Sequence, residues 1–192
     1  SACRSGRNSD WSRHRVSWCA ILFAVVAHQA GIQVTTISFT DVGVAYGSEI
    51  AVTQFNDTVH GGEWLCLIGP NGAGKSSVLR AATGLLDYSG SITIDGTEIT
   101  DRSHRWRARL VAYVPQSPSI PEDMSVYEYV LLGRNPYIAH FGTESAHDYD
   151  VIERVLNRLD LVRFARRSLG TLSGGERQRL IIARAFAQEA PI

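Results

Sequence analysis

The chain has 192 residues, and its 19 basic and 19 acidic side chains cancel to a formal net charge of zero. With 44% hydrophobic residues, the composition is that of an ordinary globular protein; it argues against intrinsic disorder, a polytopic membrane protein and a protein that mainly coats nucleic acid. Three scattered cysteines provide neither a disulfide framework nor a zinc site and favour a reducing compartment. Only one of the 19 basic residues is a lysine, Lys75.

Residues 1–33 form an extension that is first basic and then apolar. Its apolar stretch, residues 16–27, is too short to span a bilayer but has the length of a signal-peptide core. Three interpretations remain open: a secretory signal, a segment that contacts a membrane surface or a partner, and an upstream extension that is foreign to the protein.

From residue 34 onward the sequence alternates between β-like and helix-like patterns. Strands are predicted at 34–40 and 109–114, a buried parallel strand at 64–68, and a hairpin at 91–99 around Asp95-Gly96. The spacing of apolar residues predicts helices at 76–86, over most of 124–165, and at 176–188. Arg102, Arg105, Arg107 and Arg109 with Trp106 would suit a nucleic-acid patch, but the neutral net charge favours a solvated helix face.

A P-loop pattern lies where the strand at 64–68 meets the first helix. It consists of Gly69, Pro70, Asn71, Gly72, Ala73, Gly74, Lys75 and Ser76, followed by Ser77. Its glycines let backbone N–H groups surround phosphate oxygens at a helix N-terminus, whose partial positive charge faces the anion. Lys75 is expected to reach the β- and γ-phosphates, and the Ser76 hydroxyl to ligate Mg²⁺.

A second glycine motif follows, its serine 98 residues after Lys75 and just before the last predicted helix. It comprises Leu172, Ser173, Gly174, Gly175, Glu176 and Gln178, with Arg177 between the last two. Its hydroxyl, its exposed N–H groups and the helix terminus could bind a second anion. Ser173 and Glu176 also fit a helix-capping box, but a capping box does not require two consecutive glycines.

Taken with the P-loop, this motif resembles the signature sequence of ABC-type ATPases, and the resemblance covers residues 34–192. It implies an α/β fold with a RecA-like P-loop NTPase core, an antiparallel β subdomain and a helical subdomain at about residues 117–172. ATP and Mg²⁺ are the implied cofactors. Gln116 is similar to the glutamine that approaches Mg²⁺ or the attacking water, and Tyr46 to the aromatic residue that stacks on adenine.

A narrower resemblance concerns residues 126–137, which contain Gly133, Arg134 and Pro136, and the positions Asp148, Val151 and Leu156 that follow. They resemble the helical subdomain of ATPases that serve iron-siderophore, haem and cobalamin importers. The alternative is an ordinary helix end, at which Gly133 caps the helix and Pro136 prevents its continuation.

The resemblance also implies partners: a head-to-tail homodimer, transmembrane permease subunits and, indirectly, a substrate-binding protein, but no nucleic acid. It places the protein in the cytoplasm, peripherally on the inner face of the plasma membrane. In this family a strand ending in Asp-Glu follows the signature helix, so the chain as given is expected to lack its general base and to be inactive alone. Two alternatives are a soluble ABC-type ATPase of DNA repair or translation and a non-hydrolysing nucleotide-binding module.

Overall fold

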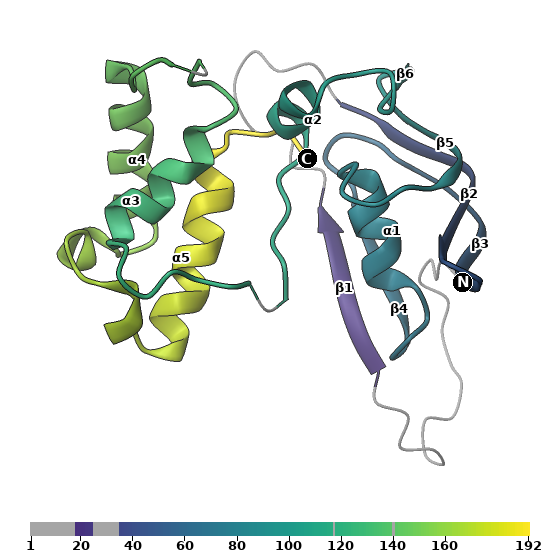
Figure 1. Cartoon of the computed structure of the whole chain (residues 1–192), viewed down its shortest axis with the longest axis horizontal. Helices are drawn as coiled ribbons and strands as arrows, with labels where there is room; N and C mark the ends of the chain where they lie inside the picture. The colour runs from purple at the N-terminus through teal and green to yellow at the C-terminus, as the bar shows by residue number, and fades with distance from the viewer. Residues whose placement is uncertain (1–17, 25–34, 117, 140) are drawn as a thin grey trace. The chain divides into compact units, whose positions relative to one another are not determined.

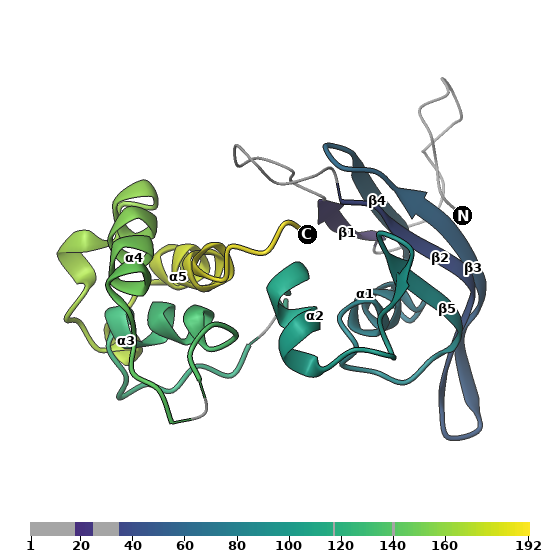
Figure 2. The ribbon, with the colours of Figure 1, turned by 90° about the horizontal axis from the view of Figure 1, so that it is seen from above.

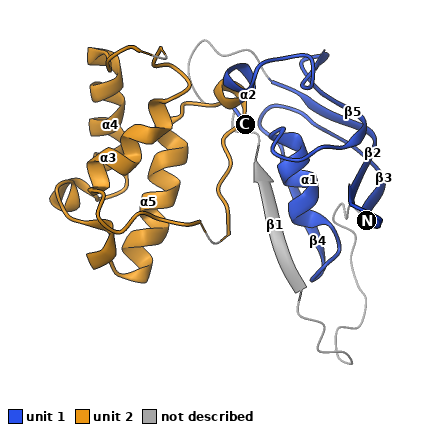
Figure 3. Cartoon of the chain, in the orientation of Figure 1, with its two compact units in different colours: residues 1–107, 191–192 blue, residues 108–190 orange. Residues whose placement is uncertain are grey.

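A computed structural model describes residues 18–24, 35–116, 118–139 and 141–192, and of 18–24 only the backbone. The interpretations of residues 1–17 and 25–34 therefore lie outside the described residues. The described chain divides into two compact units, one formed by residues up to 107 with 191–192 and the other by residues 108–190 (Figure 3).

The first unit contains a four-stranded antiparallel sheet in the order β3-β2-β5-β6 (Figure 1). Its strands are β2 (Ile37–Tyr46), β3 (Glu49–Val59), β5 (Ser89–Ile94) and β6 (Thr97–Glu98). The strand predicted at 34–40 is confirmed from Ile37 onward and continues to Tyr46. The predicted hairpin is also confirmed, because Asp95 and Gly96 both adopt the positive φ angles, 49° and 74°, of a type I′ turn.

The remaining elements of this unit carry the P-loop. Strand β4 (Trp64–Pro70) leads through the loop into helix α1 (Lys75–Ala82), which lies alongside the sheet in both views (Figures 1 and 2). The prediction of a buried parallel strand is wrong in two respects. β4 pairs antiparallel with β1 (Trp18–Ala24), and it is buried on one face only: Leu67 is buried, whereas Trp64 and Ile68 on the opposite face are exposed.

The short helix α2 (His104–Leu110) includes Arg109 and Leu110, the first two residues of the strand predicted at 109–114. The strand predicted at 109–114 is wrong. Beyond α2 the backbone runs without regular structure to Pro115, and no strand of the described chain pairs with it. Arg107 is buried, whereas Arg102, Arg105 and Arg109 are exposed, so this helix is solvated on one side only.

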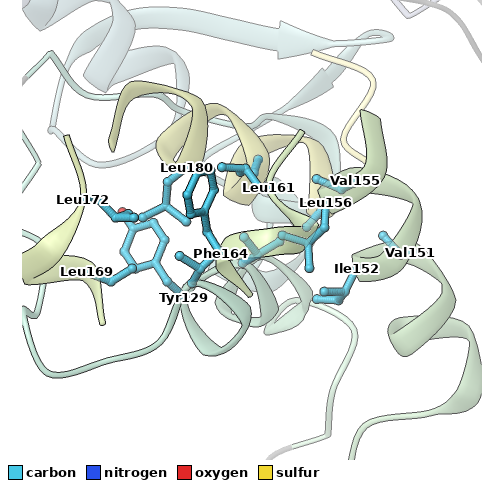
Figure 4. Packing of buried hydrophobic residues seen from close by; sticks show 14 residues of the cluster. Tyr129, Val151, Ile152, Val155, Leu156, Leu161, Phe164, Leu169, Leu172 and Leu180 are labelled. Atoms are coloured by element: carbon cyan, nitrogen blue, oxygen red, sulfur yellow. The ribbon is translucent and has the colours of Figure 1, made fainter. Parts of the chain in front are cut away.

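The second unit is helical, as predicted for most of 124–165. It contains α3 (Val126–Leu131), η1 (Leu132–Arg134), α4 (Ala146–Arg158), η2 (Val162–Phe164), η3 (Leu169–Thr171) and α5 (Gly174–Ala187). One apolar core joins these elements, and Figure 4 shows its packing. Its most deeply buried large side chains include Tyr129, Ile152, Leu161, Leu169 and Leu180. Among the described residues, no helix combines the length and the apolar composition needed to cross a bilayer.

Three helices of this unit start in the same way. Ser125, Ser145 and Ser173 cap α3, α4 and α5, and each forms a complete capping box with the acidic residue three positions later. The serine hydroxyl accepts a hydrogen bond from the backbone of the acidic residue, whose carboxylate in turn accepts one from the serine N–H. Each capping box therefore satisfies two backbone donors at the start of its helix, the N–H of the serine and that of the acidic residue.

Gly133 does not cap a helix end as the alternative interpretation proposed, but lies within η1. A Cβ atom at this position would stand 2.4 Å from the Arg184 carbonyl oxygen and 2.9 Å from the Ala187 Cβ, both on α5. A side chain here would force η1 and α5 apart, so close packing explains the glycine without any ligand.

Candidate nucleotide-binding site

The P-loop helix α1 begins differently from the capped helices. Its N-cap, Gly74, adopts a left-handed conformation with φ 77° and provides no side-chain hydrogen bond. Within the described part of the chain, the N–H groups of Lys75, Ser76 and Ser77 donate to no backbone or side-chain acceptor. A helix start with unsatisfied donors binds an anion through those N–H groups and the helix dipole. The structure thus fits a phosphate group at this position.

Two glycines give the loop its path. Gly72 and Gly74 have φ angles of 85° and 77°, which an L side chain rarely adopts. A Cβ on Gly74 would stand 2.4 Å from both the carbonyl oxygen of Ala51 and the Cγ2 of Val52, at the start of β3. Gly72 has no neighbour within 4 Å of such a Cβ. Gly74 is therefore needed for conformation and packing, and Gly72 for conformation alone.

Lys75 is 9% exposed, and its ammonium lies across the loop. Its Nζ donates hydrogen bonds to the carbonyl oxygens of Gly69, at 2.9 Å, and Pro70, at 2.7 Å. An ammonium group has three N–H donors, so a third remains for a phosphate oxygen. The adjacent Ser76 is exposed, and its hydroxyl bonds to nothing in the described residues, which leaves it able to ligate a cation.

Tyr46 lies at the end of β2, beside the P-loop helix. Its hydroxyl is 3.2 Å from the Oγ of Ser77, in the first turn of α1, while the ring is 46% exposed. The structure thus brings together Tyr46 and the P-loop, which are 29 residues apart in the sequence. The exposed ring presents surface on which a flat base can stack.

The signature motif belongs to the second unit. Ser173 caps α5: its Oγ accepts from the Glu176 N–H at 3.4 Å, and the Glu176 carboxylate accepts from the Ser173 N–H at 2.7 Å. These hydrogen bonds hold the pKa of Glu176 below its usual value. The capping interpretation is thereby confirmed, and Leu172 anchors the motif in the apolar core.

Neither backbone conformation nor packing within the described chain requires the two glycines of this motif. Gly174 and Gly175 lie in the first turn of α5 without positive φ angles, and a Cβ on either would meet nothing within 4 Å. Alanine would be the better helix former at both positions. Gln178, on the next turn, is also exposed. This surface leaves room for the close approach of a group outside the chain.

Gln116 also lies in the second unit, exposed, in the irregular segment after Pro115. The P-loop and Tyr46 form one cluster within the first unit. Gln116 and the signature motif both belong to the second unit. Two contacts of the P-loop could not be predicted from the sequence: the packing of Ala51 and Val52 against Gly74, and the hydrogen bond between Ser77 and Tyr46. Both depend on the path of the β2–β3 hairpin.

Comparison with known proteins agrees with this geometry. The family model described as ABC transporter matches residues 52–192, so the chain belongs to the ABC transporter family. It is 40% identical over 149 residues to the cobalamin import ATP-binding protein BtuD of Halobacterium salinarum, covering 75% of this chain and 37% of that protein. It is 34% identical over 154 residues to the iron(3+)-hydroxamate import ATP-binding protein FhuC of Bacillus subtilis, covering 80% and 57%.

Solved structures support the same family. An inward-facing metal-chelate type ABC transporter matches with a TM-score of 0.65 at 31% identity, covering 81% of this chain and 56% of that chain. An ATP-binding cassette in its ADP conformation shares the fold with a TM-score of 0.63 at 20% identity, covering 81% and 66%. The chain thus spans between about a third and three fifths of the length of the two curated relatives. The expected α/β P-loop fold is confirmed.

Proposed function

We propose that this chain is the nucleotide-binding part of an ATP-hydrolysing subunit that powers an importer of the iron-siderophore, haem or cobalamin type. The observation that carries this proposal is the uncapped, glycine-shaped start of α1, with Lys75 held across it. The cargo class is supported by relatives whose names specify cobalamin and iron(3+)-hydroxamate import.

In this proposal the P-loop binds the triphosphate of ATP. The free N–H groups of Lys75, Ser76 and Ser77 hold the phosphate oxygens, and the third N–H of the Lys75 ammonium reaches the β- and γ-phosphates. The Ser76 hydroxyl is the Mg²⁺ ligand that the P-loop offers, and the bound cation would neutralise charge on the phosphates. Gln116, in the second unit, is the further Mg²⁺ ligand that the family resemblance predicts. Tyr46 stacks on the adenine ring.

The signature is proposed to complete the ATP site of a second copy. The open Cβ positions of Gly174 and Gly175 support this, since they leave the α5 N-terminus accessible to the γ-phosphate of a partner. That arrangement is a head-to-tail homodimer, which would drive transmembrane permease subunits and, through them, receive cargo from a substrate-binding protein. It implies a cytoplasmic position, peripheral on the inner face of the plasma membrane.

The test is calorimetric binding of MgATP to the chain and to its Lys75→Ala variant. We expect wild-type binding and at least a tenfold loss in the variant, because the variant lacks the only ammonium side chain in the loop. Arg80→Ala is the control, since it removes an exposed cation from the same helix. Equal affinity of all three proteins for MgATP would contradict the proposal.

A further inference from the structure

The β2–β3 hairpin contacts the P-loop at two places. The first is the close approach of Ala51 and Val52 to Gly74, where there is no room for a Cβ atom. The second is the hydrogen bond between the hydroxyls of Tyr46 and Ser77. Between these contacts the chain makes a tight turn at Gly47 and Ser48, in which Gly47 has a φ of 61°. Hairpin tip and phosphate loop are therefore fixed relative to each other within the first unit.

The two hydroxyl-bearing residues differ in exposure. Ser77 is 7% exposed, and a buried hydroxyl without a partner is costly, so its bond to Tyr46 has structural weight. Tyr46 is about half exposed, which leaves much of its ring open while the hydroxyl at its far end is tethered. The tether restricts the rotation of the ring about its two side-chain torsions.

A stacking platform is effective only when it is ordered before the ligand arrives, because ordering a free side chain reduces the affinity. Tyr46 pairs with Glu49 at the very end of its strand, next to the turn. Its backbone alone therefore does not fix the orientation of the ring. The Ser77 hydroxyl supplies the missing restraint from the helix that also carries the phosphate donors. The orientation of the ring is thus restrained from α1.

We propose that Ser77 is a positioning residue for the nucleobase: its buried hydroxyl orients the Tyr46 ring for stacking. This inference rests on the proposed ATP site and adds a role that the P-loop pattern does not contain. It follows that the tyrosine hydroxyl matters although the ring, and not the hydroxyl, touches the base. It also follows that the contribution of Ser77 depends on the presence of a base in the ligand.

The experiment compares MgATP with magnesium tripolyphosphate, which carries the phosphates but no base. Affinities are measured by calorimetry for the wild type, Ser77→Ala, Tyr46→Phe, the double variant and Ser77→Thr, with melting curves to verify folding. We expect Ser77→Ala and Tyr46→Phe each to bind MgATP about three- to tenfold more weakly, the scale of one lost hydrogen bond. The double variant should be no weaker than either single variant. Ser77→Thr, which keeps the hydroxyl, should retain the wild-type affinity. Tripolyphosphate should lose less affinity than MgATP in Ser77→Ala and Tyr46→Phe, because both variants keep the backbone N–H of residue 77.

Tyr88→Phe is the matched control, because the Tyr88 hydroxyl also donates a hydrogen bond in this unit, to Glu98 at 2.8 Å, which is not a residue of the P-loop. It should not change either affinity. Losses that multiply in the double variant would overturn the inference, and so would an equal loss of tripolyphosphate and MgATP binding in Ser77→Ala. If Ser77→Ala does not fold, unchanged MgATP binding by Tyr46→Phe overturns it instead. A wild type that binds neither ligand would refute the proposed ATP site itself.

Discussion

The buried ion pair between Arg134 and Asp148 makes a quantitative prediction about stability. Arg134 is 2% exposed, and its Nε donates to Asp148 at 2.7 Å, while its Nη1 donates to the Ala187 carbonyl and to Glu189. Asp148 also accepts from Ser145 in the capping box of α4. One carboxylate therefore joins the start of α4 to the guanidinium that holds the end of α5.

The magnitude follows from the pKa of Asp148. Burial alone would raise it, but the hydrogen bonds from Ser145 and Arg134 outweigh burial and lower the pKa from 3.8 to about 2. A pKa that is lower in the folded than in the unfolded state stabilises the fold above the unfolded pKa. Here that amounts to about 2 kcal/mol, lost as the pH falls from about 4 to about 2.

We therefore expect Asp148→Asn to lower the free energy of unfolding by about 2 kcal/mol at pH 7. Urea unfolding, monitored by circular dichroism at several pH values, should show this difference shrinking below pH 4. Asp150→Asn is the matched control, since Asp150 is exposed on the same helix, and it should change stability by less than about 0.5 kcal/mol. A difference that stays constant with pH, or an equal loss in Asp150→Asn, would refute the reasoning.

Three further predictions concern the glycine and serine positions. Gly74→Ala should abolish MgATP binding and destabilise the protein more than Gly72→Ala. Both substitutions disturb a left-handed residue, but only a Cβ at position 74 also meets Ala51 and Val52. Thermal melting and calorimetry of the two variants test this. Ser173→Ala should cost about 1 kcal/mol in urea unfolding by removing the cap of α5, and full stability would show that the cap contributes nothing. Gly175→Ala should leave the isolated chain at least as stable, yet lower ATP hydrolysis in the assembled transporter; unchanged turnover there would contradict the role of the signature in a partner's site.

Local sequence patterns predicted those features that depend on a few neighbouring residues. The P-loop, the Asp95-Gly96 turn and the capping box at Ser173 all combine a required backbone conformation or hydrogen bond with residues close together in the chain. The helices of the second unit were likewise visible from apolar periodicity, because their buried faces meet in one core.

The errors concern features that depend on distant partners. Apolar residues at 64–68 and 109–114 suited strands, but the pairing of a strand is decided by what lies beside it. The packing of Gly133 against α5 could not be predicted for the same reason, because a glycine at a helix end and one at a helix contact look alike in the sequence. The link between Tyr46 and Ser77 likewise needs the full path of the hairpin.

The solitary lysine gives the protein a built-in chemical handle. Since Lys75 provides the only side-chain amine in these 192 residues, an amine-selective acylating reagent can modify no other side chain, and a lysine-specific protease can cut only within the P-loop. Both reactions require access to a residue that is 9% exposed and bonded to two carbonyl oxygens. Their rates on the purified protein would therefore report directly on the opening of the phosphate loop.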